Sequence, residues 1–389
     1  MEAGRIVFAH LMDFLPSYEF RRVVRRYRGD YRLRRFSCLD QFLAMAFAQL
    51  TYRESLRDIE TCLRAVKAKL YHAGFRGLVA RNTLAKANEN RDWRIYADLA
   101  AALISRARTL YANEPFAVDL NQAVYAFDST TVDLCLSLFP WPQFRRHKSA
   151  VKLHTLLDLH SNIPCFVHVS SGRVSDVNVL DLLPIEAGAF YIMDRGYIDF
   201  GRLHLFTAAL AFFIIRGKRG MDYVRRSGKE VDPSTGLRSD STILLTGPKT
   251  RKLYPDPLRR ISYYAADIDK RFVFLTNNFT LPALTIAQLY KCRWQVELFF
   301  KWIKQHLRIK AFYGTSVNAV KTQVWIAVCV YVLVALVKKE LGIERSLSEI
   351  LQILSISLFE KTPVFEDFLR QGDEMENVMN HNQLLLFDF

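Results

Sequence analysis

Signatures that define several enzyme classes are missing from this sequence of 389 residues. It has no G-x-x-x-x-G-K-[ST], H-E-x-x-H or G-x-S-x-G motif, so P-loop ATP hydrolysis, zincin chemistry and the serine-hydrolase elbow are unsupported. Its 6 cysteines stand singly, without a C-x-x-C pair or the spacing of metal ligands. This pattern favours a reduced compartment and argues against a structural zinc site.

A hydrophobic run long enough to cross a bilayer is also missing. The longest uncharged apolar run, Val324 to Val337, falls short of the roughly 18 to 20 residues that a span needs and predicts a buried core helix. Near the N-terminus, charged and polar residues interrupt any apolar region, so no signal peptide is predicted. We therefore expect a cytoplasmic protein with no membrane partner.

Positive charge is what the sequence has in excess. Lysine and arginine number 54 against 39 aspartates and glutamates, a formal net charge of +15. With 50% hydrophobic residues the chain can bury a substantial core, which excludes a disordered, collagen-like or disulfide-scaffold protein. The length predicts about two to three domains. The basic excess favours a polyanionic partner, nucleic acid first and an anionic membrane surface second.

Residues 1–112 read as helical. Phe42 to Leu50 and Tyr96 to Leu110 carry apolar residues at three- and four-residue spacing. Arg21 to Arg35 holds eight arginines and one aspartate. This arginine tract is either a solvated helix face or an arm that follows phosphates.

A short helix is also expected at Leu84 to Glu89, capped by Asn82 or Thr83. It gives a weak helix-turn-helix pattern, one that many helical bundles share.

From about residue 120, short β-rich runs replace the helices. They are Val124–Asp128, Val132–Phe139, Val151–Asp158, Pro164–Ser170, Phe190–Asp194, Ala211–Ile215 and Arg271–Thr276. Gly217 to Ser262 differs in composition and predicts a small β-rich insertion with a basic surface, because so long an unstructured stretch is improbable in a compact domain. A helix over Ile286 to Lys304 should close the sheet region, and helices should continue to Phe389.

The segment from Tyr290 to Lys304 is the most informative. On a helix that turns about 100° per residue, one stripe about 60° wide contains Tyr290, Arg293, Glu297 and Lys304. Buried charge costs several kcal/mol unless it is paired, so the stripe should face a cleft that holds an anion, a metal or both. The alternative, an internal Arg293–Glu297 ion pair at i,i+4, stays open.

Two aspartates end predicted strands. Asp128 closes VYAFD and Asp194 closes FYIMD, at the strand ends where α/β sheets bind ligands. Each alone is more often a turn-forming residue. Together with Glu297 they would form an acidic trio, which divalent cations such as Mg²⁺ could hold together. A pair of such ions supports phosphodiester chemistry.

These residues carry a resemblance to a known family. The spacing Tyr290-x2-Arg293-x3-Glu297-x6-Lys304 resembles the Y-R-E-K signature of bacterial insertion-sequence transposases of family four. YAFDSTTVDL and YIMDRGYIDF look like the family's two aspartate blocks, and KLHTLLDLHSNIPCF, LTNN and SLFEKTP are also similar to its members. The resemblance therefore covers the whole chain.

The resemblance implies an α/β fold: a ribonuclease H-like catalytic domain interrupted by a β-rich insertion, with a helical N-terminal DNA-binding region and a helical C-terminal tail. The implied boundaries are 1–112 for DNA-end binding, 113–216 and 266–340 for catalysis, 217–265 for the insertion and 341–389 for the tail. It also implies that the metal-binding catalytic residues are Asp128, Asp194 and Glu297, with two Mg²⁺ ions for which Mn²⁺ can substitute.

DNA contacts follow from the same resemblance. Phosphates at the transposon end would be contacted by Tyr290, Arg293 and Lys304. Phe272 stands where a relative has a tryptophan that stacks on a flipped base, and the alternative for it is a buried strand residue. Arg195 and Tyr197 follow Asp194 and are further DNA-binding candidates, unless RGY is a structured turn.

Several other polar residues are lesser candidates. Lys152 and His154 lie on a predicted strand, where a lone histidine is more often a hydrogen-bonded structural residue than a base. The alternative carboxylates near the two blocks are Asp119, Asp133, Asp176 and Asp199.

The expected function is that of an insertion-sequence transposase, which cleaves transposon ends and joins their 3′-hydroxyls to target DNA. The expected partners are double-stranded DNA and a second copy of the chain in a synaptic complex, in a bacterial cytoplasm close to the nucleoid. A metal-dependent nuclease without strand transfer and a catalytically silent, transposase-derived DNA-binding protein are the alternatives.

Overall fold

The computed structural model describes residues 5–33, 35–112, 114, 116–134, 139, 143–145, 148–306 and 312–361. The chain divides into two compact units. The helical unit takes in the described residues of 1–112, 132–141 and 300–389, and the sheet unit those of 113–131 and 142–299. The predicted tail beyond residue 361 lies outside the described residues.

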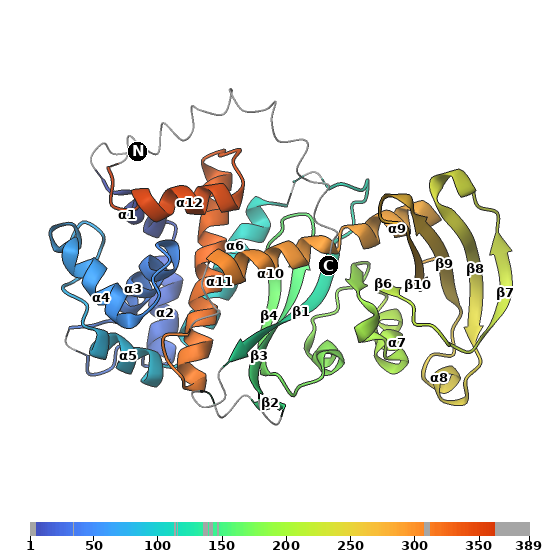
Figure 1. Ribbon diagram of the computed structural model, residues 1–389, viewed down its shortest axis with the longest axis horizontal. Coiled ribbons are helices and arrows are strands. Elements are labelled where there is room, and N and C mark those ends of the chain that lie inside the picture. The colour runs from blue at the N-terminus through green and yellow to red at the C-terminus, as the bar shows by residue number, and fades with distance from the viewer. Residues whose placement is uncertain are drawn as a thin grey trace. The chain divides into compact units, whose positions relative to one another are not determined.

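The helical unit is built around one long apolar helix, α11 (Figure 1). Its elements are α1 (Val7–Asp13), α2 (Ser17–Arg26), α3 (Cys38–Leu50), α4 (Leu56–Ala65), the 3₁₀ turn η1 (Lys67–Lys69), α5 (Arg81–Asn90), α6 (Arg94–Leu110), α11 (Val317–Glu340) and α12 (Leu347–Ser357). By length and composition α11 could cross a membrane, since the helix extends beyond the apolar run seen in the sequence. However, 89% of its apolar window is buried inside the protein, where it packs against α3 and α6, so it is a core helix.

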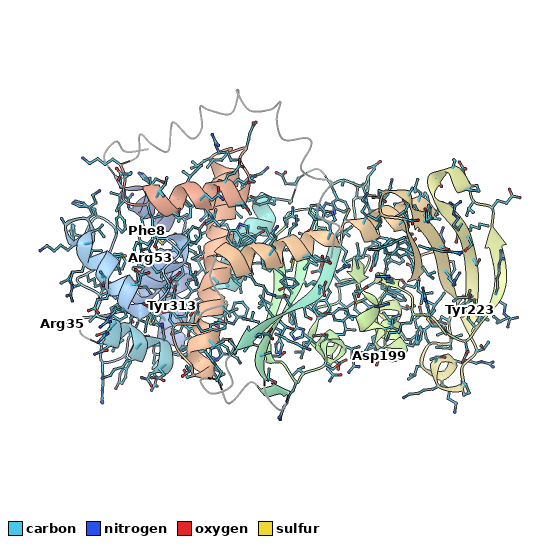
Figure 2. All side chains as sticks on the ribbon, in the orientation of Figure 1. Phe8, Arg35, Arg53, Asp199, Tyr223 and Tyr313 are labelled. Carbon is cyan, nitrogen blue, oxygen red and sulfur yellow. The ribbon has the colours of Figure 1, made fainter. Side chains whose placement is uncertain are left out.

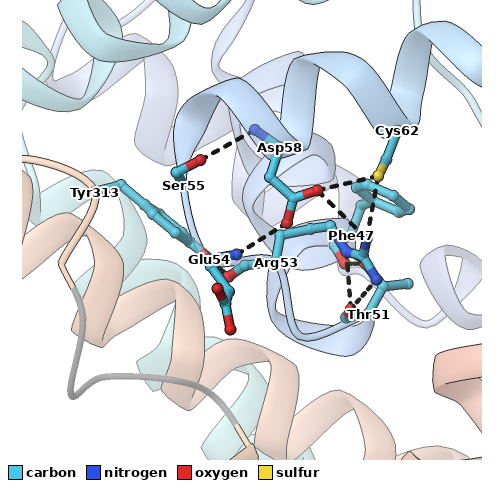
Figure 3. Close-up of polar contacts among 8 residues, drawn as sticks. All are labelled: Phe47, Thr51, Arg53, Glu54, Ser55, Asp58, Cys62 and Tyr313. Carbon is cyan, nitrogen blue, oxygen red and sulfur yellow. Dashed lines mark hydrogen bonds and ion pairs between the residues drawn. The ribbon is translucent and has the colours of Figure 1, made fainter.

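Polar contacts around Arg53 fix the turn between α3 and α4 (Figure 3). The Arg53 guanidinium donates to the carbonyl of Thr51 and pairs with Asp58 at 3.5 Å. Ser55 caps α4 by accepting a hydrogen bond from the Asp58 backbone N–H. The hydroxyl of Tyr313 donates to the Arg53 carbonyl at 2.7 Å and so ties the segment before α11 to this turn.

The structure bears on two predictions about the N-terminal region, the cap of α5 and the arginine tract. The predicted cap of α5 is wrong, because the helix begins at Arg81 and no side chain caps it; Asn82 and Thr83 lie within its first turn. In α2 the buried residues form one side of the helix, and the arginines Arg21, Arg22, Arg25 and Arg26 are exposed. This part of the arginine tract is accessible from solvent.

The sheet unit contains a mixed ten-stranded sheet with the order β2-β3-β1-β5-β6-β10-β9-β8-β7, and β4 pairs with β3. The strands are β1 (Val124–Leu134), β2 (Gln143–Arg145), β3 (Lys148–Asp158), β4 (Pro164–Ser171), β5 (Phe190–Met193), β6 (Phe212–Arg216), β7 (Tyr223–Lys229), β8 (Leu237–Leu245), β9 (Leu258–Ala265) and β10 (Lys270–Thr276). The parallel neighbours β1, β5 and β6 form its centre. The α/β class predicted from the sequence is confirmed at this level.

Further helices lie between these strands and after the last of them. They are η2 (Asp176–Leu182), η3 (Arg195–Tyr197), α7 (Phe200–Ala208), η4 (Pro233–Thr235), α8 (Pro248–Leu253), η5 (Ala266–Ile268), α9 (Ala283–Lys291) and α10 (Trp294–His306). One face of the central strands carries a buried cluster that includes Tyr125, Phe127, Tyr191, Met193 and Phe213. Because successive side chains on a strand point to opposite faces, Asp128 lies on the face opposite this cluster.

The predicted insertion is β-rich but does not form a separate sheet. Its strands β7, β8 and β9 continue the sheet outward from β10, side by side (Figure 1). Every residue of β7, which begins at Tyr223 (Figure 2), is exposed. Composition indicated strands, but it could not indicate that they would pair with β10.

The single helix predicted over Ile286 to Lys304 is wrong, because the structure has two helices. α9 ends at Lys291, and α10 begins at Trp294. Between them the Arg293 backbone N–H donates to the carbonyl of Tyr290, three residues earlier, as in a 3₁₀ turn. A uniform turn of about 100° per residue therefore does not apply across Cys292 and Arg293.

Candidate active site

Two of the predicted carboxylates lie side by side on neighbouring parallel strands. Phe127 on β1 is in register with Met193 on β5, so Asp128, within β1, and Asp194, directly after β5, are the next residues of the two chains. Four buried residues, Phe190–Met193, make up β5 and favour a central strand. The prediction that both aspartates end their strands is right for Asp194, which follows β5, and wrong for Asp128, because β1 continues through Asp128 to Leu134 and crosses the break predicted before Val132.

Residues at the α9–α10 junction connect these aspartates to Glu297. The hydroxyl of Tyr290 donates to Asp194 Oδ1 at 3.2 Å. Arg293 donates from Nη1 to Asp128 Oδ2 and from Nη2 to Glu297 Oε1, at 2.6 Å each. Tyr290 and Arg293, at one helix junction, thus contact all three predicted carboxylates, Asp194 in one hydrogen-bonded set and Asp128 with Glu297 in the other. Of the two interpretations left open for Arg293, the internal i,i+4 pair with Glu297 is present, and Arg293 contacts Asp128 in addition.

Burial and charge shape the behaviour of this group. Burial raises the pKa of Asp128 to about 6. The charges of Glu297 and Asp194 also raise this pKa, and the positive charge of Arg293 opposes them only in part. Although burial opposes its charge, Tyr290, Asp128 and Glu297 hold the pKa of Arg293 above its ordinary value. Burial also raises the pKa of the Tyr290 hydroxyl, which therefore stays a hydrogen-bond donor.

The group is open on one side. The side chains of Arg293 and Asp128 are 17% and 20% exposed, whereas that of Glu297 is 58% exposed. Arg293 Nε is buried without a hydrogen-bond partner. Arg293 is therefore paired at two nitrogens, has no partner at the third and lies next to an exposed carboxylate. Its guanidinium can change partners when an anion arrives.

The residues suit a divalent cation in their chemistry, since carboxylate oxygens are the ligands that hard cations prefer. Across the described part of the chain, however, no three acidic, histidine or cysteine side chains lie close enough together to hold a metal ion. The Arg293 guanidinium lies between Asp128 and Glu297 and is the cation that compensates them here. The carboxylates therefore suit a metal ion, provided that the Arg293 guanidinium moves away from Asp128 and Glu297.

The other predicted contact residues differ in accessibility. Arg195 is exposed, directly after Asp194. Tyr197 is only 3% exposed and packs against Phe127, so RGY is a structured turn and a direct DNA contact by Tyr197 is not supported. Lys304 lies further along α10, in the helical unit.

Phe272 on β10 is half-buried. The Arg216 guanidinium lies over its ring, 5.1 Å from the centroid, and the rings of Phe274 and Tyr290 are its neighbours. It is therefore neither a fully buried strand residue nor an open stacking platform in this structure.

Sequence reasoning underrated one cluster next to the site. The Ser129 hydroxyl donates to Asp176 Oδ1 at 2.9 Å, and Lys152 Nζ lies 3.1 Å from the same oxygen. The signal in the sequence was the adjacency of Ser129 to Asp128. Of the other alternative carboxylates, Asp199 caps α7, and both Asp119 and Asp133 are exposed.

Two family models match this chain. The model described as "Transposase DDE domain" matches residues 120–333, which include Asp128, Asp194 and Glu297. A domain of unknown function, DUF4372, matches residues 3–76.

Curated relatives extend these matches. The Sinorhizobium fredii protein "Putative transposase y4zB" is 32% identical over 285 residues, which are 72% of this chain and 78% of its own length. The Geobacillus stearothermophilus protein "Probable transposase for insertion sequence element IS5377" is 30% identical over 208 residues, 53% of this chain and 54% of its own. A Synechocystis protein, "Putative transposase for insertion sequence element IS4SA", is 22% identical over 341 residues, 83% of this chain and 90% of its own.

Proposed function

Because the chain belongs to the DDE transposases of bacterial insertion sequences, we propose that Asp128, Asp194 and Glu297 are its catalytic, metal-binding triad. Enzymes of this family cleave and join DNA phosphodiester bonds with the help of divalent metal ions. One observation carries the assignment: two residues of one helix junction donate to all three carboxylates, Tyr290 to Asp194 at the end of β5, and Arg293 to Asp128 on β1 and Glu297 on α10.

The surrounding layout supports a ribonuclease H-like catalytic domain. Its proposed centre is the parallel set β1, β5 and β6, with β3 and β4 on one side. The first acidic residue lies within β1, the second directly follows the adjacent strand β5, and the third comes from a helix. The strands β7, β8 and β9 then form the insertion between the second and third acidic residues.

The triad would hold two Mg²⁺ ions, or Mn²⁺, which supply an activated nucleophile and stabilise the leaving oxygen. The chain's own residues prepare that site. Tyr290 orients Asp194 by donating to Oδ1. Arg293 neutralises Asp128 and Glu297, and its planar fork of donors suits a DNA phosphate as well as a carboxylate.

Duplex DNA, at the element's ends and at the target, is the proposed partner. The cations proposed to contact its phosphates are Arg293, Lys304, exposed Arg195 and the arginine tract, with Tyr290 beside them. Phe272 is proposed to stack on a flipped base once Arg216 moves off its ring. A homodimer on paired ends completes the proposal, in the bacterial cytoplasm close to the nucleoid.

The triad is tested by isosteric substitution. Asp128→Asn, Asp194→Asn and Glu297→Gln should each lower end cleavage by about a thousandfold or more while DNA binding survives, because each removes a charged ligand. Asp181→Asn serves as a control, since this carboxylate pairs with Arg202 away from the triad. Normal cleavage by a triad variant would remove that residue from the active site.

Direct metal ligation is tested with Asp128→Cys. Thiolate is a soft ligand that suits Mg²⁺ poorly, so Mn²⁺ should restore part of the cleavage and Mg²⁺ should not. Equal failure with both ions would indicate that Asp128 does not bind the metal.

Strand transfer separates the proposal from a nuclease that only cuts. A pre-cleaved end with a free 3′-hydroxyl should be joined to target DNA by the wild-type chain and not by Asp128→Asn. Cleavage without joining would favour the nuclease.

The arginine tract is tested through salt dependence. Changing Arg21, Arg22 and Arg25 to glutamine should lower the slope of log K against log salt by about 0.9 for each arginine that contacts a phosphate. An unchanged slope would leave the tract as a solvated helix face.

A further inference from the structure

We propose that Ser129, Asp176 and Lys152 form a positioning group that holds Asp128 in place from the opposite face of the sheet. The inference rests on the proposed role of Asp128 as a metal ligand and adds residues that do not touch the metal or DNA themselves.

Ser129 is held at both ends. Its backbone N–H donates to Asp128 Oδ1 at 2.8 Å, and its hydroxyl donates to Asp176 Oδ1 at 2.9 Å. The first bond fixes the rotation of the Asp128 carboxylate relative to the strand, and the second fixes the backbone that makes the first. Asp176 therefore acts on Asp128 through Ser129.

Lys152 pairs with Asp176 and holds it in place. Its Nζ atom lies 3.1 Å from Asp176 Oδ1 and donates to the carbonyl of Val174 at 2.9 Å. The Lys152 side chain is only 11% exposed, and a cation that is this buried needs a partner. One lysine thus fixes both the Asp176 carboxylate and the turn that leads into it.

His154 does not share this role. Burial lowers its pKa to about 4, so the ring is neutral at pH 7, and its Nε2 atom is hydrogen-bonded to the Ser170 hydroxyl at 2.8 Å. Its Nδ1 atom is 3.7 Å from Asp176, too far for a hydrogen bond. Lys152 is therefore the cation that compensates Asp176.

The proposed metal ligand and its positioning residue lie on opposite faces of β1. Ser129 shares the face of Tyr125 and Phe127, which belong to the buried cluster, and Asp128 points the other way. Groups behind a metal ligand commonly set its orientation, and removing one typically lowers metal affinity by about 10- to 100-fold. A purely structural ion pair has no such effect on metal binding.

The test uses the full-length chain and Mn²⁺ as the probe. Ser129→Ala should raise the Mn²⁺ concentration for half-maximal cleavage about tenfold and weaken Mn²⁺ binding, read by electron paramagnetic resonance, to a similar extent. Ser129→Thr keeps the hydroxyl and should restore both values. The double variant Ser129→Ala/Asp176→Ala should be no worse than Asp176→Ala alone, because both act through one bond.

A matched control lies on the same short helix. Asp181 belongs to η2, as Asp176 does, and pairs with Arg202 at 2.7 Å. Asp181→Ala removes an ion pair from η2 without touching Ser129, so its metal dependence should equal that of the wild type.

Two results would overturn the inference: wild-type Mn²⁺ dependence in Ser129→Ala, or a shift in Asp181→Ala as large as that in Asp176→Ala. Failure of the proposed triad is a separate result, because Asp128→Asn would then cleave normally. An inactive Asp128→Asn beside an unaltered Ser129→Ala would reject the positioning group alone.

Discussion

Two arginine–aspartate pairs of the sheet unit differ in how completely they are satisfied. Arg259 and Asp240 join β9 to β8 with two hydrogen bonds, at 2.9 and 2.7 Å, and are 3% and 5% exposed. Arg259 also donates to the carbonyls of Asn278 and Leu281. Arg293 instead divides its donors between Asp128 and Glu297 and leaves Nε without a partner.

Under the proposed function, the difference separates a structural ion pair from the catalytic group. The Arg259 pair is sealed and has donors for each acceptor, so nothing is gained by moving it. The Arg293 group is partly open, holds more carboxylates than cations and keeps one of them with a raised pKa. Under the proposed function, this excess of carboxylate is what binds the cation.

The largest effect should come from breaking the sealed pair. Asp240→Ala leaves the Arg259 guanidinium buried without its partner and should lower the free energy of unfolding by about 3 to 5 kcal/mol. Urea unfolding of the full chain measures it. Asp128→Asn should change stability much less than it changes cleavage. If Asp240→Ala unfolds like the wild type, the contrast between the two pairs fails.

A smaller effect should come from Arg293→Gln. Without the guanidinium, Asp128 and Glu297 lose their resident cation, so Mn²⁺ should bind the DNA-free chain on the order of tenfold more tightly. Cleavage should nevertheless fall, since the proposed contact of Arg293 with a DNA phosphate is lost. Calorimetric titration with Mn²⁺ measures the first change, and weaker binding would show that Arg293 supports the metal site instead of competing with it.

The smallest effect should come from pH. The Asp128 pKa is raised to about 6 in the folded chain, so this carboxyl is protonated below pH 6 and a cation must displace the proton. One such proton should weaken Mn²⁺ binding about fourfold between pH 7 and pH 5.5. In Asp128→Asn this part of the pH dependence should disappear, and its persistence would assign the proton to another group.

The local sequence placed one of the two aspartates correctly. Asp128 and Asp194 each follow a run of apolar residues, and Asp194 does follow the end of β5, but β1 continues through Asp128 to Leu134 because its later residues pair on in the folded sheet. Only one of the two contacts of Arg293 could be predicted from the sequence. Its spacing from Glu297 predicts the i,i+4 pair, whereas the contact with Asp128 joins residues 165 positions apart and depends on the folded chain.

The features that the sequence did not predict also depend on contacts between distant parts of the chain. The pairing of β9 with β10 and the 3₁₀ turn at Arg293 depend on tertiary contacts that periodicity does not encode. Tyr197 looked like a candidate because it is close to Asp194 in sequence, but the turn directs it into the core. The bond from Ser129 to Asp176 likewise spans 47 residues.

The outermost strand, β7, has a consequence for the solubility of the protein. A strand at the margin of a sheet exposes backbone donors and acceptors that invite another chain to add on, as happens in fibrils. On β7 the side chains Arg225, Arg226 and Lys229 are all exposed and carry like charge. The β7 edges of two molecules therefore repel each other, so the sheet can end at an exposed edge strand without pairing with a second copy of the protein.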